Sequence, residues 1–198
     1  FREAMLYIDL LNNPTKGRAL IEKLKTDYPD TRLGKNAGSI LQSLDKDAEA
    51  KKTQAALAPG TVFPDFNFKS VTGQSVSVAE LKGKVVLIDF WATWCPPCLA
   101  ELPNIIATYN KYHDKGFDII SVSLDSDRDK LDSFLKQQNG MTWPQIFDGK
   151  GWDNELVAKY GVEAIPFTIL VGPDGKIIGT SLKGAALGEA VDKALAKK

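Results

Sequence analysis

Two cysteines separated by two residues are the part of this sequence best suited to chemistry. Cys95 and Cys98 are the only cysteines among the 198 residues, and Pro96 and Pro97 lie between them. A disulfide between residues so close in sequence closes a very short loop and adds little to stability. The pattern therefore predicts a redox-active pair, and it leaves a metal site, a structural bridge and an unreactive pair as the alternatives.

The segments on either side of the pair predict an ionisable sulfur at Cys95. Residues 85–91 form a nearly continuous apolar run, which is typical of a strand buried on both faces. Residues 96–113 have the apolar spacing of a helix, and prolines are favourable in its first turn. The partial positive charge and free N–H groups at the start of a helix favour the thiolate, which is the attacking species in disulfide exchange. We therefore predict that Cys95 attacks the substrate disulfide. Cys98, about one turn further and more buried, is predicted to resolve the mixed disulfide.

The sequence predicts neither a metal nor another cofactor. A structural zinc site needs four ligands, and the chain offers the two cysteines and one distant histidine, His113. Gly172, Gly175 and Gly179 do not form a dinucleotide fingerprint, because they lie in a predicted hairpin and not between a strand and a helix. We therefore expect the chemistry to use the chain's own side chains.

Composition and charge are those of an ordinary globular protein. Hydrophobic residues make up 43% of the chain and charged residues 25%, which is enough for a sizeable core. The 25 basic and 25 acidic residues cancel, so no basic excess exists to bind nucleic acid. No apolar run approaches the roughly 18 residues that span a bilayer. Because the chain begins at Phe1 without a leader-like segment, we expect a processed N-terminus.

The sequence predicts two regions of different character. Residues 1–57 follow helical patterns, and we expect them to be the remainder of a longer N-terminal region. Residues 58–198 alternate between strand and helix patterns, which predicts an α/β domain with a mixed central sheet and helices on both faces. The predicted strands cover residues 62–68, 75–78, 85–91, 117–124, 143–147, 167–171 and 176–180. The predicted helices of this region cover residues 96–113, 127–138, 154–160 and 185–197.

Residues 85–98, which read Val-Val-Leu-Ile-Asp-Phe-Trp-Ala-Thr-Trp-Cys-Pro-Pro-Cys, resemble the active-site segment of the thioredoxin superfamily. The likeness extends to Pro103, where the family has a helix-kinking proline, and to Ile165-Pro166, where it has a cis-proline. The likeness covers about residues 60–198 and implies a thioredoxin-like fold and thiol–disulfide exchange.

A closer likeness is to the TlpA/ResA-type, extracytoplasmic branch of this superfamily. Its marks are the predicted strand pair within residues 62–78, Glu101 after the cysteine pair, and an insertion around residues 141–160. This resemblance implies the bacterial periplasm or cell envelope, protein thiols and disulfides as partners, and a membrane-bound electron donor. It does not indicate the oligomeric state or the natural substrate.

Two carboxylates near the cysteines have roles that the resemblance implies. Asp89, six residues before Cys95, matches the family's buried aspartate, which helps to move the proton of Cys98. Glu101, one turn after Cys98, matches a glutamate that tunes thiol acidity. From the residues alone, Asp89 could also point to solvent at a strand end, and Glu101 could be a solvated helix residue.

The resemblance also implies a surface that contacts an incoming polypeptide. From its adjacency to Cys95, and not from the resemblance, Trp94 is expected to be a partly exposed wall beside the sulfur, next to Pro96 and Pro97, with a core aromatic as the alternative. Pro166 is expected to pack beside the cysteine pair, and Ile165 to offer backbone hydrogen bonds to the substrate. Without the resemblance, Pro166 reads as a proline at the start of a strand.

We predict an enzyme that reduces protein disulfides through a cycle between the dithiol and the disulfide of Cys95 and Cys98. One alternative is a thiol peroxidase of the related AhpC/TSA type, but Ile88 and Ala92 stand where its Pro-x-x-x-Thr/Ser-x-x-Cys motif needs proline and a hydroxyl. The other alternative is a binding module in which residues 1–57 bind a partner and the cysteines are vestigial.

Overall fold

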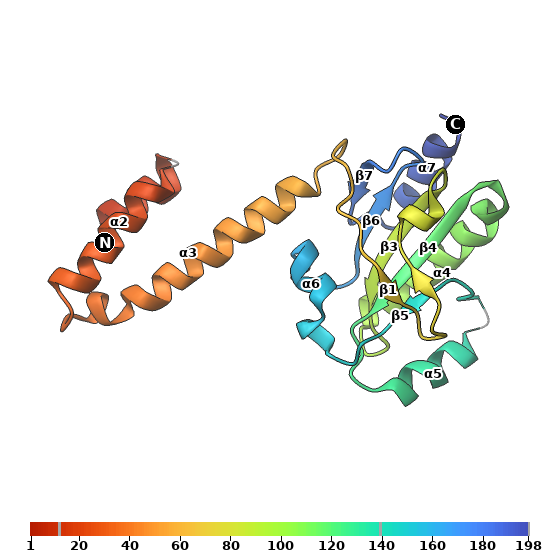
Figure 1. The fold of residues 1–198 in the computed structure, drawn as a ribbon, viewed down its shortest axis with the longest axis horizontal. Helices are drawn as coiled ribbons and strands as arrows, with labels where there is room; N and C mark the ends of the chain where they lie inside the picture. Colours follow the sequence, from red (N-terminus) through yellow and green to blue (C-terminus); the bar gives the residue numbers. More distant parts are fainter. Residues whose placement is uncertain (12, 139, 198) are drawn as a thin grey trace. The chain divides into compact units, whose positions relative to one another are not determined.

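A five-stranded mixed sheet is the centre of the C-terminal part of the chain (Figure 1). The computed structural model describes residues 1–11, 13–138 and 140–197. The strand order is β5-β4-β3-β6-β7, in which β3 runs parallel to β4 and antiparallel to β6. The strands are β3 (Val85–Trp91), β4 (Phe117–Ser123), β5 (Gln145–Ile146), β6 (Phe167–Val171) and β7 (Ile177–Thr180).

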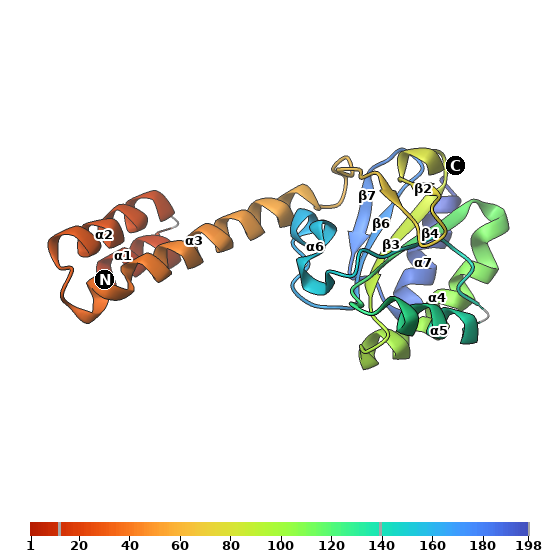
Figure 2. The same cartoon turned by 60° about the horizontal axis from the view of Figure 1, so that its bottom comes forward.

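Helices cover both faces of this sheet. Successive side chains of β3 point to opposite faces and contact different helices. Phe90 packs against Tyr160 of α6, whereas Trp91 packs against Phe134 of α5. Helices α4 and α7 pack against each other, as Figure 2 shows. The helices are α4 (Pro96–Tyr112), α5 (Arg128–Gln137), α6 (Glu155–Tyr160) and α7 (Gly184–Leu195), with short 3-10 turns η2 (Ala79–Leu81), η3 (His113–Lys115) and η4 (Gly151–Asp153). The predicted mixed sheet between helices is confirmed.

The segment before β3 corrects one prediction. The strand predicted over residues 62–68 is wrong, because that range contains only an isolated bridge of Val62 with Lys176 and the start of β1 (Phe68–Lys69), which pairs with β2 (Ser75–Val76). Pro64 has no N–H to donate to a ladder. Asp65 turns its carboxylate to the backbone N–H groups of Val78 and Ala79, at 2.9 Å each. These contacts hold the segment as an irregular strap.

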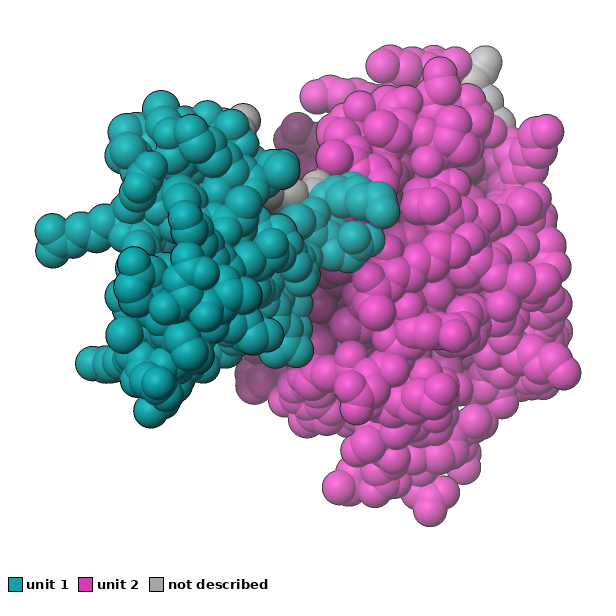
Figure 3. Space-filling model, turned by 60° about the vertical axis from the view of Figure 1, so that its left-hand side comes forward, with its two compact units in different colours: residues 1–52 teal, residues 53–198 magenta. Residues whose placement is uncertain are grey.

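The chain divides into two compact units, residues 1–52 and residues 53–198, which Figure 3 colours separately. The first unit contains α1 (Arg2–Met5), the π-helix η1 (Leu6–Leu10), α2 (Pro14–Asp27) and most of α3 (Arg32–Ala56). Its own small core is built on Ala4, Ile21 and Ala37. In the parts of the chain that the structure describes, no helix is both long and apolar enough to cross a bilayer. The boundary at residues 57/58 stays a prediction.

Candidate active site

Cys95 lies where the turn after β3 meets the start of α4, and its side chain caps that helix. The backbone N–H of Cys98 donates a hydrogen bond to the Cys95 Sγ at 3.2 Å, and the two cysteines form a disulfide with Cα atoms 5.3 Å apart. The same N–H and the positive end of the helix stabilise a thiolate once the bridge is reduced. Both cysteines are 4% exposed in this oxidised form, so the prediction that Cys98 is the more buried one is wrong.

A buried carboxylate holds the turn that precedes Cys95. Asp125 accepts the backbone N–H of Thr93 at 3.1 Å, the Thr93 hydroxyl at 2.6 Å, and the Ser123 hydroxyl at 2.8 Å. Asp125 is not among the site residues predicted from the sequence. A signal was available, because Asp125 follows the apolar run of β4, and the carboxyl ends of parallel neighbours such as β3 and β4 meet at one edge of a sheet.

Asp89 is buried in the centre of the sheet, with 2% of its surface exposed. In the register it lies opposite Ser121 of β4 and Thr168 of β6. The Ser121 hydroxyl donates to Asp89 Oδ2 at 3.4 Å, whereas Oδ1 has no hydrogen-bond partner among the described residues. Burial raises the pKa of Asp89 from 3.8 to about 7, although the Ser121 hydrogen bond opposes the rise and the charge of Glu101 adds to it. The structure therefore excludes a solvent-facing Asp89.

Glu101 links helix α4 to the start of helix α7. Its carboxylate accepts the backbone N–H of Gly184, the first residue of α7, and the side-chain amide of Asn104. Carboxylates are favourable at a helix start because they meet its free N–H groups and its partial positive charge. The Glu101 side chain is half-buried, and its charge reaches Asp89, so the two carboxylates belong to one electrostatic site.

The residues predicted to contact substrate surround the cysteine pair. Trp94 is 52% exposed, and Pro96 and Pro97 are exposed as well. The Cys95 Sγ lies 3.7 Å from the carbonyl oxygen of Ile165. The Ile165–Pro166 peptide bond is cis, as the resemblance predicts. The structure thus brings this loop to the sulfur from far along the chain.

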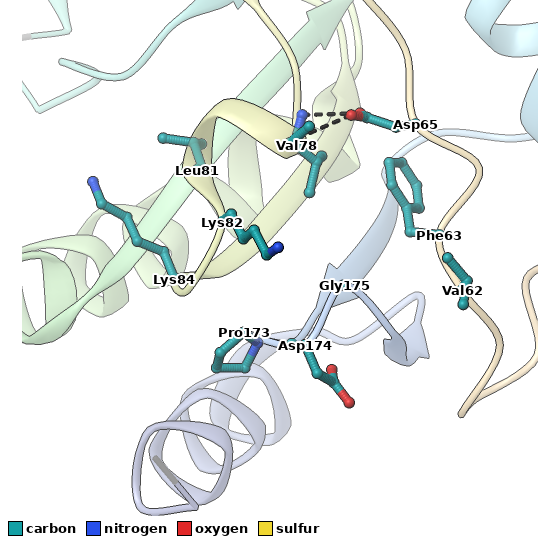
Figure 4. Close-up of a pocket in the computed structure, with 12 residues that line it drawn as sticks. Val62, Phe63, Asp65, Val78, Leu81, Lys82, Lys84, Pro173, Asp174 and Gly175 are labelled. Carbon is teal, nitrogen blue, oxygen red and sulfur yellow. Dashed lines mark hydrogen bonds between the residues drawn. The ribbon is translucent and has the colours of Figure 1, made fainter.

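A separate hollow lies elsewhere on the domain and includes neither cysteine (Figure 4). The strap residues Val62 and Phe63 line it together with Leu81 and Pro173. In the described ranges, no group of three or more histidine, cysteine, aspartate or glutamate side chains is arranged to hold a metal ion.

Comparison with known proteins gives the family. Residues 58–195 match the Redoxin family. ResA, a thiol-disulfide oxidoreductase from Bacillus thuringiensis subsp. konkukian, is 33% identical over 138 residues, which are 70% of this chain and 77% of that protein. The thioredoxin domain of a thiol-disulfide oxidoreductase from Bacteroides vulgatus has a TM-score of 0.62 and 35% identity, and the likeness covers 69% of this chain and 96% of that one.

A second solved structure agrees with this result. A putative thiol:disulfide interchange protein DsbE from Chlorobium tepidum has a TM-score of 0.61 and 32% identity, over 70% of this chain and 98% of that one. The matched region contains the whole five-stranded sheet and the disulfide at the start of α4. The chain therefore belongs to the Redoxin family, within which it is a ResA-like thiol–disulfide oxidoreductase.

Proposed function

We propose that this oxidoreductase reduces disulfide bonds of other polypeptides. In the reduced form, the Cys95 thiolate attacks one sulfur of the substrate disulfide. That bond breaks, a mixed disulfide forms, and the other substrate sulfur leaves as a thiolate. Cys98 then loses its proton and attacks the Cys95 Sγ, which releases the second substrate thiolate. The substrate gains two electrons, and the cysteine pair loses two as it closes into a disulfide.

The hydrogen bond from the Cys98 N–H to the Cys95 Sγ carries this proposal. This N–H belongs to Cys98 and donates to the sulfur of Cys95, so the hydrogen bond distinguishes the two cysteines. It lowers the cost of a negative charge on Cys95 and leaves Cys98, inside the first turn of α4, to resolve the mixed disulfide.

Asp89 is proposed to accept the proton that Cys98 loses in the second step. A pKa of about 7 lets this carboxyl group gain and lose a proton near neutral pH. Glu101 is proposed to tune this step through its charge, which favours the protonated form of Asp89. Because the two carboxylates interact, their titrations are coupled.

The substrate is proposed to lie across Trp94, Pro96 and Pro97 and beside the loop of Ile165 and Pro166. The exposed tryptophan offers an apolar surface with a polar edge. The 3.7 Å contact between the Cys95 Sγ and the Ile165 carbonyl supports a substrate chain that hydrogen-bonds to the backbone of Ile165 while its sulfur reaches Cys95.

The setting of the reaction is proposed from the ResA-like resemblance. We propose an extracytoplasmic protein of the bacterial periplasm or cell envelope that a membrane-bound donor re-reduces. The two prolines between the cysteines add no cation that would favour a strongly oxidising pair, which supports the direction of reduction. We further propose residues 58–198 as the thioredoxin-like domain and residues 1–57 as a separate helical segment.

Insulin reduction with a chemical thiol donor tests this function in the full chain. The unaltered protein is expected to reduce insulin over many catalytic cycles. Reduced Cys98→Ser, mixed with insulin after the donor has been removed, is expected to release one substrate thiol per molecule and then stop at the mixed disulfide. Cys95→Ser is expected to reduce insulin no faster than the donor alone. Turnover that survives in Cys95→Ser would overturn the proposal.

A further inference from the structure

We propose that Ser121 and Trp143 are positioning residues for Asp89. Together they hold Oδ2 of Asp89 as a hydrogen-bond acceptor and leave Oδ1 as the oxygen that takes up and releases the proton. This inference rests on the proposed function, because it specifies how Asp89 would accept a proton from Cys98.

The three side chains form a hydrogen-bonded row in the interior. The Trp143 Nε1–H donates to the Ser121 Oγ at 2.8 Å, and the Ser121 hydroxyl donates to Asp89 Oδ2 at 3.4 Å. The three residues are 3%, 0% and 2% exposed, so water does not compete freely for these groups. The Trp143 ring packs 4.9 Å from the Tyr109 ring of α4, which fixes the indole in place.

The donor chemistry of tryptophan sets the direction of the row. An indole N–H donates and does not accept, so it occupies a lone pair of the Ser121 oxygen. The single hydrogen of that hydroxyl is then free to point at Asp89. Thr168, opposite Asp89 on the other neighbouring strand, donates its hydroxyl to the Leu182 carbonyl and does not compete.

The two oxygens of Asp89 therefore differ. A proton on Oδ1 leaves the hydrogen bond from Ser121 to Oδ2 intact, whereas a proton on Oδ2 would force the hydroxyl to turn away. Oδ1 has no partner in the described part of the chain. Among the described residues in the disulfide form, the groups that act on the charge of Asp89 are Ser121 on β4 and Glu101 on α4. Of these, Ser121 favours the ionised carboxylate, and Trp143 strengthens that bond by polarising the hydroxyl.

Carboxyl carbon NMR of the reduced full chain tests the row by the titration of Asp89. Ser121→Ala is expected to raise the pKa of Asp89 by roughly one pH unit, because the ionised form loses its donor. Trp143→Phe is expected to raise it by less, because the hydroxyl remains. Ser121→Thr keeps a hydroxyl and is expected to restore the unaltered titration.

Trp91→Phe is the matched control for Trp143→Phe. Trp91 is also 3% exposed, and its indole N–H donates to the Gln145 Oε1 at 3.1 Å and not to Ser121. It is expected to leave the titration of Asp89 unchanged. The inference would be overturned if the pKa of Asp89 does not change in Ser121→Ala, or if it changes equally in Trp143→Phe and Trp91→Phe.

The pH profile of single-turnover insulin reduction separates this inference from the proposed function. In Ser121→Ala the half-maximal pH is expected to move up together with the titration of Asp89. If Asp89→Asn moves the profile and Ser121→Ala does not, the inference fails and the proposed function stands. If Asp89→Asn itself leaves the profile unchanged, the proposed part of Asp89 fails, and the inference fails with it.

Discussion

The Sγ of Cys95 lies 3.7 Å from the carbonyl oxygen of Ile165, a residue 70 positions later in the chain. In the disulfide form the sulfur has no hydrogen, so this is a contact, and the reduced thiol gains an acceptor at the same place. The contact brings the start of α4 against the loop that enters β6. In the proposed mode of binding, a polypeptide that reaches the sulfur meets the backbone of this loop.

The exposed face of Trp94 leads to a prediction about substrate binding. Trp94→Ala is expected to raise the KM for a protein disulfide about fivefold, which corresponds to about 1 kcal/mol of lost contact. The free energy of unfolding should change by less than about 0.5 kcal/mol, because half of the side chain is already in water. Steady-state insulin reduction and urea unfolding check the two halves of this prediction.

Trp152→Ala is the matched control for that variant, because Trp152 is 45% exposed and lies on η4, away from the cysteine pair in sequence. It should leave the KM unchanged. Equal effects of the two variants would argue against Trp94 as a substrate contact.

The charge of Glu101 raises the pKa of Asp89, so removal of this charge is expected to lower that pKa. Glu101→Gln removes a negative charge that opposes ionisation, so the pKa of Asp89 should fall. The helix start at Gly184 should lose about 0.5 kcal/mol of favourable charge interaction. Carboxyl carbon NMR measures the first effect and urea unfolding the second. Glu189→Gln, on the exposed face of helix α7, is the control and should leave the pKa of Asp89 unchanged. A pKa shift of the same size in that control would refute a specific effect of Glu101.

The burial of Asp89 predicts how stability depends on pH. The ordinary pKa of 3.8 applies to the unfolded chain, and the folded chain has a pKa of about 7. Between these two values the folded state holds a proton that the unfolded state has lost, so the free energy of unfolding falls as pH rises through this window. The loss is constant above about pH 7 and amounts to about 4 kcal/mol, at 1.36 kcal/mol for each pH unit.

Asp89→Asn removes this dependence. The variant should gain stability relative to the unaltered chain as pH rises from 4 to 7 and should keep that gain at pH 8. Urea unfolding followed by tryptophan fluorescence measures it in the second unit, since all four tryptophans lie within residues 53–198. A stability difference that stays the same across this pH range would show that Asp89 is ionised in the folded state.

Much of the redox site could be predicted from the sequence because its parts are local. The apolar run of β3, the prolines after Cys95 and the periodicity of α4 are properties of neighbouring residues, and they place a cysteine at a helix start without knowledge of the rest of the fold. The hairpin of β6 and β7 was equally local, since a turn-forming run joins its two strands.

The supports of the site could not be predicted in the same way. Asp125 meets Thr93, and Trp143 meets Ser121, only after distant segments have come together. Hydrophobic periodicity says which face of a strand is buried, but it does not say which polar side chain meets which. The incorrect strand prediction over residues 62–68 has a similar cause. The contacts of Asp65 with Val78 and Ala79, later in the chain, determine the structure of that segment.

In the proposed mechanism, Cys95 attacks the substrate disulfide and Cys98 resolves the mixed disulfide. The most direct test of this mechanism is to mix reduced Cys98→Ser chain with insulin, block free thiols, and identify the cross-linked peptides by mass spectrometry, with reduced Cys95→Ser treated in parallel. We predict a stable mixed disulfide at Cys95 in the first variant and little or none at Cys98 in the second. Faster or greater capture by Cys98 in the Cys95→Ser chain would show that Cys95 is not the attacking thiol.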